Sequence, residues 1–373
     1  MAQDPKSLTK DIKSVGSSVT RLLDPSEVYE RHVRGRRTVY LDNNVWIALT
    51  DQKTAVAAEC LEVCRLAVSS KIALFPVSYA SVMELLGQPL NAPRKNQSSL
   101  MDELSEGVSF RAAAPVERVE VRSAFSFFIG DSFEPPSKVE LFTYIIDSVA
   151  DNCLEVPDSF KEQDAQNLVG HLRTHAGIRS VSWLLEHLDV DALRSRHLAM
   201  GDRFVSLMSR SIRESSEHFR LGSKPDTKGM LREEYYYLFT KKILPLFREL
   251  MLERWSPEEL VVELPRRMEK FTECNGKGGP EQLARLISKM PSINLFAQMM
   301  QARSMDSKRQ VRRQDFWDIE HARVSGAYAD AFVTCDRNLV DLLESRCQVP
   351  VEKNCLIVRK LRDLVTLLKG WCG

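Results

Sequence analysis

Short apolar runs near both ends of the chain predict β-strands that are buried on both faces. They lie at residues 38–42, 72–77, 331–334 and 355–358. None of them alternates between apolar and polar positions, which is typical of strands in a parallel sheet covered by helices. Apolar residues at helical spacing predict helices at residues 44–49, 54–68, 316–328, 337–343 and 361–368. Ser78 is a suitable N-cap for a further helix, which runs to Leu86 and ends at Gly87.

The middle of the chain has a different pattern, because the alternation of strands and helices stops near residue 90 and resumes near residue 314. Helical spacing is found at residues 139–150, 165–188, 203–219, 231–255 and 281–290. Segments rich in Gly, Pro and Ser separate these helices. We therefore predict an α/β fold with a three-layer α/β/α parallel sheet, interrupted by an all-α insertion. The predicted units are an N-terminal helical extension (1–36), a discontinuous α/β domain (37–90 plus 314–373) and the insertion (91–313).

The composition is that of a globular protein with a sizeable core. The 373 residues are 43% hydrophobic and 28% charged, with a formal net charge of +1. A balanced charge gives no overall attraction to nucleic acid or membrane, so any polyanion site must be a local patch. No apolar run approaches the roughly 20 residues that span a bilayer, and no apolar signal segment opens the chain, so we expect a cytoplasmic protein. The eight cysteines form no C-x-x-C pair, which favours free thiols over structural zinc.

Acidic side chains stand beside the predicted strands. Asp42 ends the first strand, Asp336 follows the third, Glu84 lies in the helix after the second, and Asp318 opens the helix before the third. Active residues of open parallel sheets gather beyond the carboxyl ends of the strands. Two carboxylates about 5 Å apart repel by roughly 3 kcal/mol at an effective dielectric of about 20, so such a cluster needs a proton or a cation. Mg²⁺ or Mn²⁺ suits oxygen ligands and supports hydrolysis of a phosphodiester.

These segments resemble the PIN-domain nucleases. The resemblance rests on YLDNNVWIAL (40–49), FPVSYASVMELL (75–86) and DIEHARVSGAYADAFVTCDRNL (318–339), which follow the order of the family's motifs. It implies a PIN-like fold and a metal-dependent endonuclease, with RNA favoured over DNA. It also implies that Asp42, Glu84, Asp318 and Asp336 are catalytic and hold the metal, and that Asp330 is an extra metal ligand. The long insertion departs from compact members of the family.

Each candidate also has a structural interpretation. Asp42 and Asp336 could cap helices, Glu84 could be a surface charge, and Asp318 could be an early-helix acid favoured by the helix dipole. Asp315 lies one turn before Asp318 on nearly the same face, so it competes for the same role. Other polar neighbours are Thr334, Asn43, Asn44 and His321, and we expect His321 to be a buried partner of a ligand rather than a general base.

Two segments outside the acidic cluster could contact nucleic acid. Lys308, Arg309, Arg312 and Arg313 could hold phosphate groups or form a solvated linker. Three tyrosines at residues 235–237, followed by Lys241 and Lys242, could stack on bases. For the tyrosines we favour a packed helix face.

Other classes of function remain open from the sequence. The chain could be a catalytically inactive module that binds nucleic acid or protein, although the retention of four clustered acids argues against it. Asp42 could be a phosphoryl-accepting nucleophile, but Asn44 stands where such enzymes commonly have a second aspartate. The insertion could cap the site, select substrate, form a homodimer or bind an inhibitory protein partner, and no residue pattern decides among these.

Overall fold

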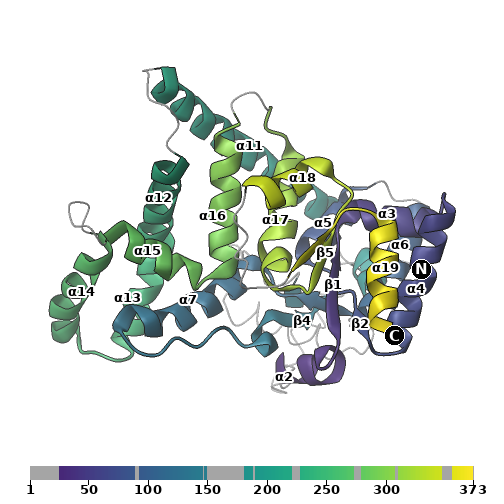
Figure 1. Cartoon of the computed structure of the whole chain (residues 1–373), viewed down its shortest axis with the longest axis horizontal. Coiled ribbons are helices and arrows are strands. Elements are labelled where there is room, and N and C mark those ends of the chain that lie inside the picture. Colours follow the sequence, from purple (N-terminus) through teal and green to yellow (C-terminus); the bar gives the residue numbers. More distant parts are fainter. Residues whose placement is uncertain are drawn as a thin grey trace, which may run out of the picture.

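A four-stranded parallel sheet lies at the centre of the computed structural model (Figure 1), in the strand order β2-β1-β5-β6. Its strands are β1 (Arg37–Leu41), β2 (Ala73–Leu74), β5 (Ala331–Val333) and β6 (Leu356–Val358). Strands from the two ends of the chain therefore pair side by side, and the predicted α/β class with a parallel sheet is confirmed. The structure describes residues 25–88, 92–145, 147–148, 180–187, 190–220, 227–272, 279–306, 310–346 and 355–372.

The pairing of β1 with β5 creates the seam at which the site lies. Val39, Tyr40 and Leu41 pair with Ala331, Phe332 and Val333, and all six side chains are buried. Apolar side chains on both faces explain why these strands show no polar alternation. From β1 the chain moves to β2 on one side, and from β5 it moves to β6 on the other. The seam is thus a topological switch point, the usual position of a ligand site in an open parallel sheet.

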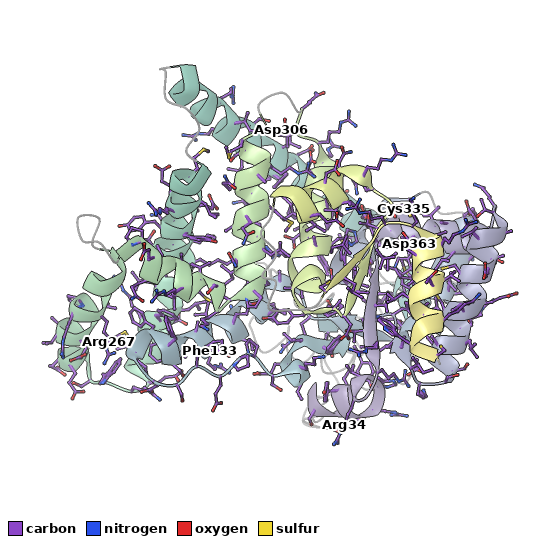
Figure 2. All side chains as sticks on the ribbon, viewed as in Figure 1. Arg34, Phe133, Arg267, Asp306, Cys335 and Asp363 are labelled. Atoms are coloured by element: carbon purple, nitrogen blue, oxygen red, sulfur yellow. The ribbon has the colours of Figure 1, made fainter. Side chains whose placement is uncertain are left out.

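Helices flank the sheet, and side chains fill the space between them (Figure 2). α4 and α19 pack together on one side of the strands, and α17 lies on the other (Figure 1). Thr54 and Ser78 cap α4 and α5 with their side-chain oxygens, as expected of helix N-caps. The helices of this part are α3 (Asn43–Asp51), α4 (Ala55–Ser69), α5 (Tyr79–Gly87), α17 (Arg313–Tyr328), α18 (Arg337–Asp341), the π-helical turn η4 (Leu342–Arg346) and α19 (Leu361–Cys372).

The prediction that residues 91–313 are all-α is wrong, because this segment contains an antiparallel strand pair, β3 (Val108–Phe110) and β4 (Phe142–Tyr144). The predicted helix at residues 139–150 is wrong over its first part, where the 3₁₀ turn η2 (Lys138–Leu141) leads into β4. Phe142, Thr143 and Tyr144 are aromatic and β-branched residues that fit a strand. Phe142 packs on Phe110 of β3 with ring centroids 4.8 Å apart. This long-range packing outweighs the helical spacing.

Some of the remaining helices contribute to the core around the sheet, with side chains such as Leu100, Val181 and Phe204, and the others form a second core. It contains Phe128, Phe239 and Phe247, and the rings of Phe128 and Phe247 lie 4.6 Å apart. The predicted helix at residues 231–255 is found as α12, η3 and α13 in succession. The helices are α6 (Ala92–Ser105), α7 (Ala113–Ile129), α10 (Val181–His187), α11 (Val190–Arg220), α12 (Thr227–Leu238), the π-helical turn η3 (Phe239–Ile243), α13 (Leu244–Leu252), α14 (Pro257–Thr272), α15 (Gly279–Ser288) and α16 (Pro291–Ser304).

Two predictions fall partly outside the described residues. Most of the helix predicted at residues 165–188 does so, and its end is α10. The N-terminal extension is described from residue 25, where α2 (Pro25–Val28) and the π-helical turn η1 (Tyr29–Val33) precede β1. Within the part of the chain that is described, no helix combines the length and the apolar character needed to cross a membrane.

Candidate metal centre

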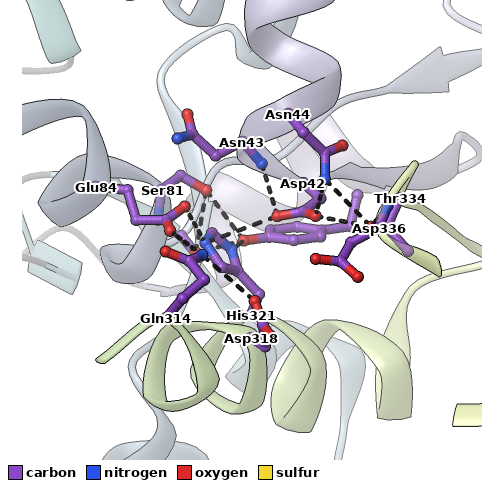
Figure 3. Close-up of polar contacts among 12 residues, drawn as sticks. Asp42, Asn43, Asn44, Ser81, Glu84, Gln314, Asp318, His321, Thr334 and Asp336 are labelled. Carbon is purple, nitrogen blue, oxygen red and sulfur yellow. Dashed lines mark hydrogen bonds and ion pairs between the residues drawn. The ribbon is translucent and has the colours of Figure 1, made fainter. Parts of the chain in front are cut away.

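Four acidic side chains from four separate segments lie around one point beyond the carboxyl ends of β1 and β5 (Figure 3). Asp42 follows β1, Glu84 lies in α5, Asp318 lies in α17 and Asp336 follows β5. Asp42, Glu84 and Asp318 are buried, with 5%, 7% and 4% of their surface exposed, and Asp336 is half-buried. The structure therefore brings together the residues that the sequence singles out as catalytic.

Asp42 is held in place by both neighbouring strand ends. Its Oδ1 accepts a hydrogen bond from the backbone N–H of Asn43 at 2.7 Å, so it also caps α3. Its Oδ2 accepts hydrogen bonds from Thr334 Oγ1 at 2.7 Å and Asn44 Nδ2 at 2.8 Å. Burial is the main cause that raises the pKa of Asp42, and the nearby Glu84 raises it further, while His321 opposes the shift. A carboxylate in this position calls for a positive partner.

Glu84 is linked to the sheet through His321. Its Oε2 lies 2.7 Å from His321 Nε2, and its Oε1 accepts a hydrogen bond of 2.6 Å from Gln314 Nε2. The other ring nitrogen of His321, Nδ1, hydrogen-bonds with the hydroxyl of Tyr40 on β1. Burial alone would lower the pKa of His321, but Tyr40 and the Glu84 and Asp42 carboxylates raise it well above the usual value. Glu84 is therefore a buried, oriented acid and not the solvated surface charge of the alternative interpretation.

Asp318 is a buried acid with other carboxylates nearby. Burial, followed by the charges of Asp42 and Asp336, raises its pKa to about 8, although Arg303 acts in the opposite direction. Gln314 Nε2 donates to Asp318 Oδ1 at 3.3 Å, and Arg303 Nη2 lies 3.6 Å from Asp318 Oδ2. Asp318 thus contributes an oxygen that a cation would stabilise.

Asp315, the competitor of Asp318, has a structural role at the start of the same helix. Its Oδ2 accepts a hydrogen bond from the backbone N–H of Arg312 at 2.8 Å, which closes a cap around the first turn of α17. Its Oδ1 lies 3.3 Å from Arg303 Nη2. Asp315 therefore caps the helix, whereas Asp318 lies beside the other acids (Figure 3), whose charges act on it, and is the better candidate for the centre.

Asp336 and Asp330 lie at opposite ends of β5. Asp336 caps α18, since its Oδ1 accepts hydrogen bonds from the backbone N–H groups of Asn338 and Leu339 at 2.7 and 3.1 Å. Asp330 precedes β5 and accepts hydrogen bonds from the backbone N–H and hydroxyl of Thr38, at 2.8 and 2.9 Å. Thr38 and Asp42 are four residues apart on an extended strand, which corresponds to about 13 Å. The structure therefore does not bring Asp330 to the other four acids, because Asp330 ties the amino ends of β1 and β5 together.

Several residues in the two segments predicted to contact nucleic acid have partners within the protein. Lys308 and Arg309 lie outside the described residues, and Arg313 forms two bonds with Asp202, one of them 2.9 Å long. Tyr235 is buried and donates a hydrogen bond to Asn294, as expected of a packed helix face, while Tyr236 and Tyr237 are exposed. Lys242 is ion-paired with Glu117. The exposed Tyr236 and Tyr237 are accessible for the predicted contact with nucleic acid, whereas Tyr235, Lys242 and Arg313 are engaged within the protein.

Three of these side chains form a group that could hold a metal ion. Among the described residues, one ligand atom each from Asp42, Glu84 and His321 lies within 4.8 Å of the other two, and all three side chains are buried. The prediction that this site can hold a metal ion fits that arrangement. Sequence reasoning placed His321 only beside the ligands, and it did not identify Tyr40, Gln314 or Arg303. For His321 a signal existed, because it follows Asp318 at the i, i+3 spacing that puts both side chains on one helix face.

The chain matches no family model, and no curated protein or solved structure is significantly similar to it. The function must therefore be argued from the geometry and chemistry of the site itself.

Proposed function

We propose that the protein is a metal-dependent endonuclease with a PIN-like fold, and that it hydrolyses phosphodiester bonds in RNA in preference to DNA. The proposal rests on one observation: beyond the seam of β1 and β5, four acids lie close together (Figure 3), namely Asp42, Glu84, Asp318 and Asp336. Buried acids with raised pKa values in one cluster are frequent at functional sites. The preference for RNA and the PIN-like fold come from the resemblance of the sequence motifs.

The side chains in this centre are arranged to hold negative oxygens in fixed positions. Thr334 and Asn44 orient Asp42, and Gln314 connects Glu84 with Asp318 through one amide nitrogen. A divalent cation held by these oxygens supplies Lewis-acid activation of water and of the phosphodiester. Because water would be the nucleophile in such a reaction, no side chain of the cluster would have to form a covalent bond to the substrate.

Polar side chains with greater exposure surround the buried acids. Asn43, Asn44 and Asp336 are half-buried, and Gln314 and Cys335 are exposed. They provide hydrogen-bonding groups at the point where a phosphodiester would approach Asp42 and Asp318. Arg337 follows Asp336 and is exposed, so it is a candidate for contact with a neighbouring phosphate.

The proposal is tested by incubating the purified full-length protein with end-labelled single-stranded RNA and DNA. Each substrate is assayed with Mg²⁺, with Mn²⁺ and with EDTA. We expect cleavage with either metal, none with EDTA, faster cleavage of RNA, and loss of cleavage in Asp42→Asn and Asp336→Asn. Absence of cleavage under every metal condition would refute the nuclease, and a stable phosphorylated Asp42 would support a phosphotransfer mechanism instead.

A second candidate function is an inactive module that binds nucleic acid or protein. It is favoured by one observation: the acids already have partners within the protein. His321 pairs with Glu84 at 2.7 Å, and Arg303 lies 3.6 Å from Asp318. Such contacts offset part of the clustered charge without a cation. Binding of single-stranded RNA with an affinity independent of metal, and without turnover, is the result that this candidate predicts.

A further inference from the structure

The ligand set of the centre includes a nitrogen as well as carboxylate oxygens. His321 Nε2 lies 2.7 Å from Glu84 Oε2 and 3.9 Å from Asp42 Oδ1. The His321 ring is 1% exposed, so it meets these acids away from solvent. His321 is therefore placed between two carboxylates that come from different elements, at the end of β1 and in α5 (Figure 3).

We propose that His321 Nε2 is a direct metal ligand together with Asp42 and Glu84, and that the centre selects Mn²⁺ over Mg²⁺. This inference rests on the proposed metal-dependent function, because it names the ion and one ligand of that same site. It also assigns Asp318 and Asp336 to the periphery of the ion, since neither belongs to the group whose ligand atoms lie within 4.8 Å of one another.

The separations from His321 Nε2 to the two carboxylates are close to those between ligands of one ion. Metal–ligand bonds of about 2.0–2.2 Å place neighbouring donor atoms about 3 Å apart and opposite donors about 4.3 Å apart. The two separations measured from His321 Nε2 are 2.7 and 3.9 Å, close to these limits. Small side-chain adjustments of a few tenths of an ångström are enough to open the shorter contact. In the metal-free protein that contact is a hydrogen bond, and a cation takes the place of the bridging proton.

The remaining nitrogen of His321 is fixed by a hydrogen-bond chain that reaches the sheet. Nδ1 bonds with the Tyr40 hydroxyl, which also lies 2.7 Å from Ser78 Oγ and 3.0 Å from Ser81 Oγ. The Tyr40 ring stacks on Phe332 of β5 with centroids 5.4 Å apart. Histidines that bind metals usually have such a partner on the second nitrogen, because it sets the orientation of the ring. The chain aims Nε2 at the acids from a rigid support.

The donor set decides between the two ions that the carboxylates alone would accept. Mg²⁺ prefers oxygen ligands and several waters, whereas imidazole nitrogen suits first-row transition ions. With one imidazole and two carboxylates, the centre is expected to bind Mn²⁺ more tightly than Mg²⁺. If His321 only supports Glu84 through a hydrogen bond, the bound ion has oxygen ligands alone and this preference has no source.

The test is to load the metal-stripped, full-length protein with Mn²⁺ and to record its electron spin echo envelope modulation. A directly bound imidazole gives a nitrogen coupling, which depends on ligation and not on activity. We expect this coupling in the wild type and in His32→Gln, and we expect it to be lost in His321→Gln. His32 is a matched control, because it lies in η1 before the amino end of β1 and bonds to Glu106.

Affinities provide the second measurement. In competition titrations, we expect His321→Gln to weaken Mn²⁺ binding by at least roughly tenfold while Mg²⁺ binding changes much less. Tyr40→Phe keeps the ligand and loses its support, so we expect the nitrogen coupling to persist while Mn²⁺ affinity falls by about tenfold. Tyr40→Phe and the wild-type spectrum keep the inference testable if His321→Gln does not fold.

The outcomes separate this inference from the proposed nuclease. Mn²⁺ bound without nitrogen coupling, equal weakening of both ions in His321→Gln, or no Mn²⁺ binding at millimolar concentration would overturn the assignment of His321. Nitrogen coupling in a protein that cleaves neither RNA nor DNA would support His321 as a ligand and refute the nuclease. Metal-dependent cleavage by a protein that shows no nitrogen coupling would support the nuclease and refute His321 as a ligand.

Discussion

Repulsion and burial of the clustered acids should lower the free energy of unfolding of the metal-free protein, and Asp318→Asn tests this most clearly. Burial, together with the charges of Asp42 and Asp336, raises the pKa of Asp318 from its usual value of 3.8 to about 8. The folded protein therefore retains a proton that the unfolded chain releases. Because the folded pKa lies above the unfolded one, stability falls as the pH rises from about 4 to about 8.

The magnitude follows from the difference between the unfolded pKa and the pH of the solution. At pH 7 this difference is about 3 units, and each unit corresponds to about 1.4 kcal/mol, so Asp318 costs up to roughly 4 kcal/mol. An asparagine has no carboxylate to protonate, but it loses the contact with Arg303, which lies 3.6 Å from Asp318. We expect Asp318→Asn to raise the free energy of unfolding by about 2–4 kcal/mol at pH 7 in EDTA.

The assay is urea unfolding followed by tryptophan fluorescence at pH 4 and pH 7, with Asp341→Asn as the control. Asp341 is exposed at the last position of α18, so it provides the same chemical change outside the cluster. The gain should appear at pH 7, nearly vanish at pH 4, and be absent from the control. An equal effect at both pH values, or no gain at pH 7, would refute the electrostatic reasoning.

Three further variants test other parts of the account. Glu120 accepts hydrogen bonds from Ser292, Ile293 and Tyr328, and burial raises its pKa to about 7, so the raised pKa has little effect on stability at pH 5. Glu120→Gln should therefore lower the free energy of unfolding by about 2–4 kcal/mol in urea titrations at pH 5, whereas the exposed Glu62→Gln should change it little. Burial alone would raise the pKa of Glu106, but hydrogen bonds from two basic side chains and the charge of Arg36 hold it at about 2. The Glu106 carboxylate therefore stabilises the fold above about pH 4.5, and this stabilisation is lost as the pH falls towards 2. Because the side chain is partly exposed, solvent screens its interactions, and Glu106→Gln should lower the free energy of unfolding by only about 1–2 kcal/mol at pH 7. Acid denaturation curves should show the difference from wild type shrinking at low pH. A Cβ at Gly201 would lie 3.0 Å from Arg313 Cβ at the start of α17, so Gly201→Val should lower thermal stability by about 1–3 kcal/mol, and an unchanged melting temperature would show that α11 and α17 pack less closely.

The central sheet could be predicted because its signals are local. Each central strand is a compact apolar run, and a capping side chain stands directly before the helices that follow, as with Ser78 and α5. The pair of β3 and β4 could not be predicted in the same way. Ser109 pairs with Thr143 across more than thirty residues, and its stabilisation comes from contacts such as Phe110 on Phe142. Helical spacing within one segment carries no information about such a partner.

The candidate site, like the fold, could be predicted from the sequence only in part. Asp42 and Asp336 could be placed because each follows a strand of a parallel sheet. The same rule places Asp330 away from them, because it precedes β5, and its predicted role as a ligand comes from the resemblance of its motif alone. Arg303 and Gln314 could not be identified as partners of Asp318, because their roles depend on how α16 meets α17 and on the side-chain conformation in the folded cluster.

We propose above all that the buried acids beyond β1 and β5 form a hydrolytic metal centre. The most direct measurement is the single-turnover rate constant for cleavage of a labelled single-stranded RNA in Mn²⁺, for the wild type, Asp42→Asn and Asp341→Asn. We predict that Asp42→Asn lowers this rate constant by on the order of a hundredfold or more, and that the exposed Asp341→Asn leaves it within about threefold. Equal rates in the wild type and Asp42→Asn, or cleavage by the wild type that persists in EDTA, would contradict the account.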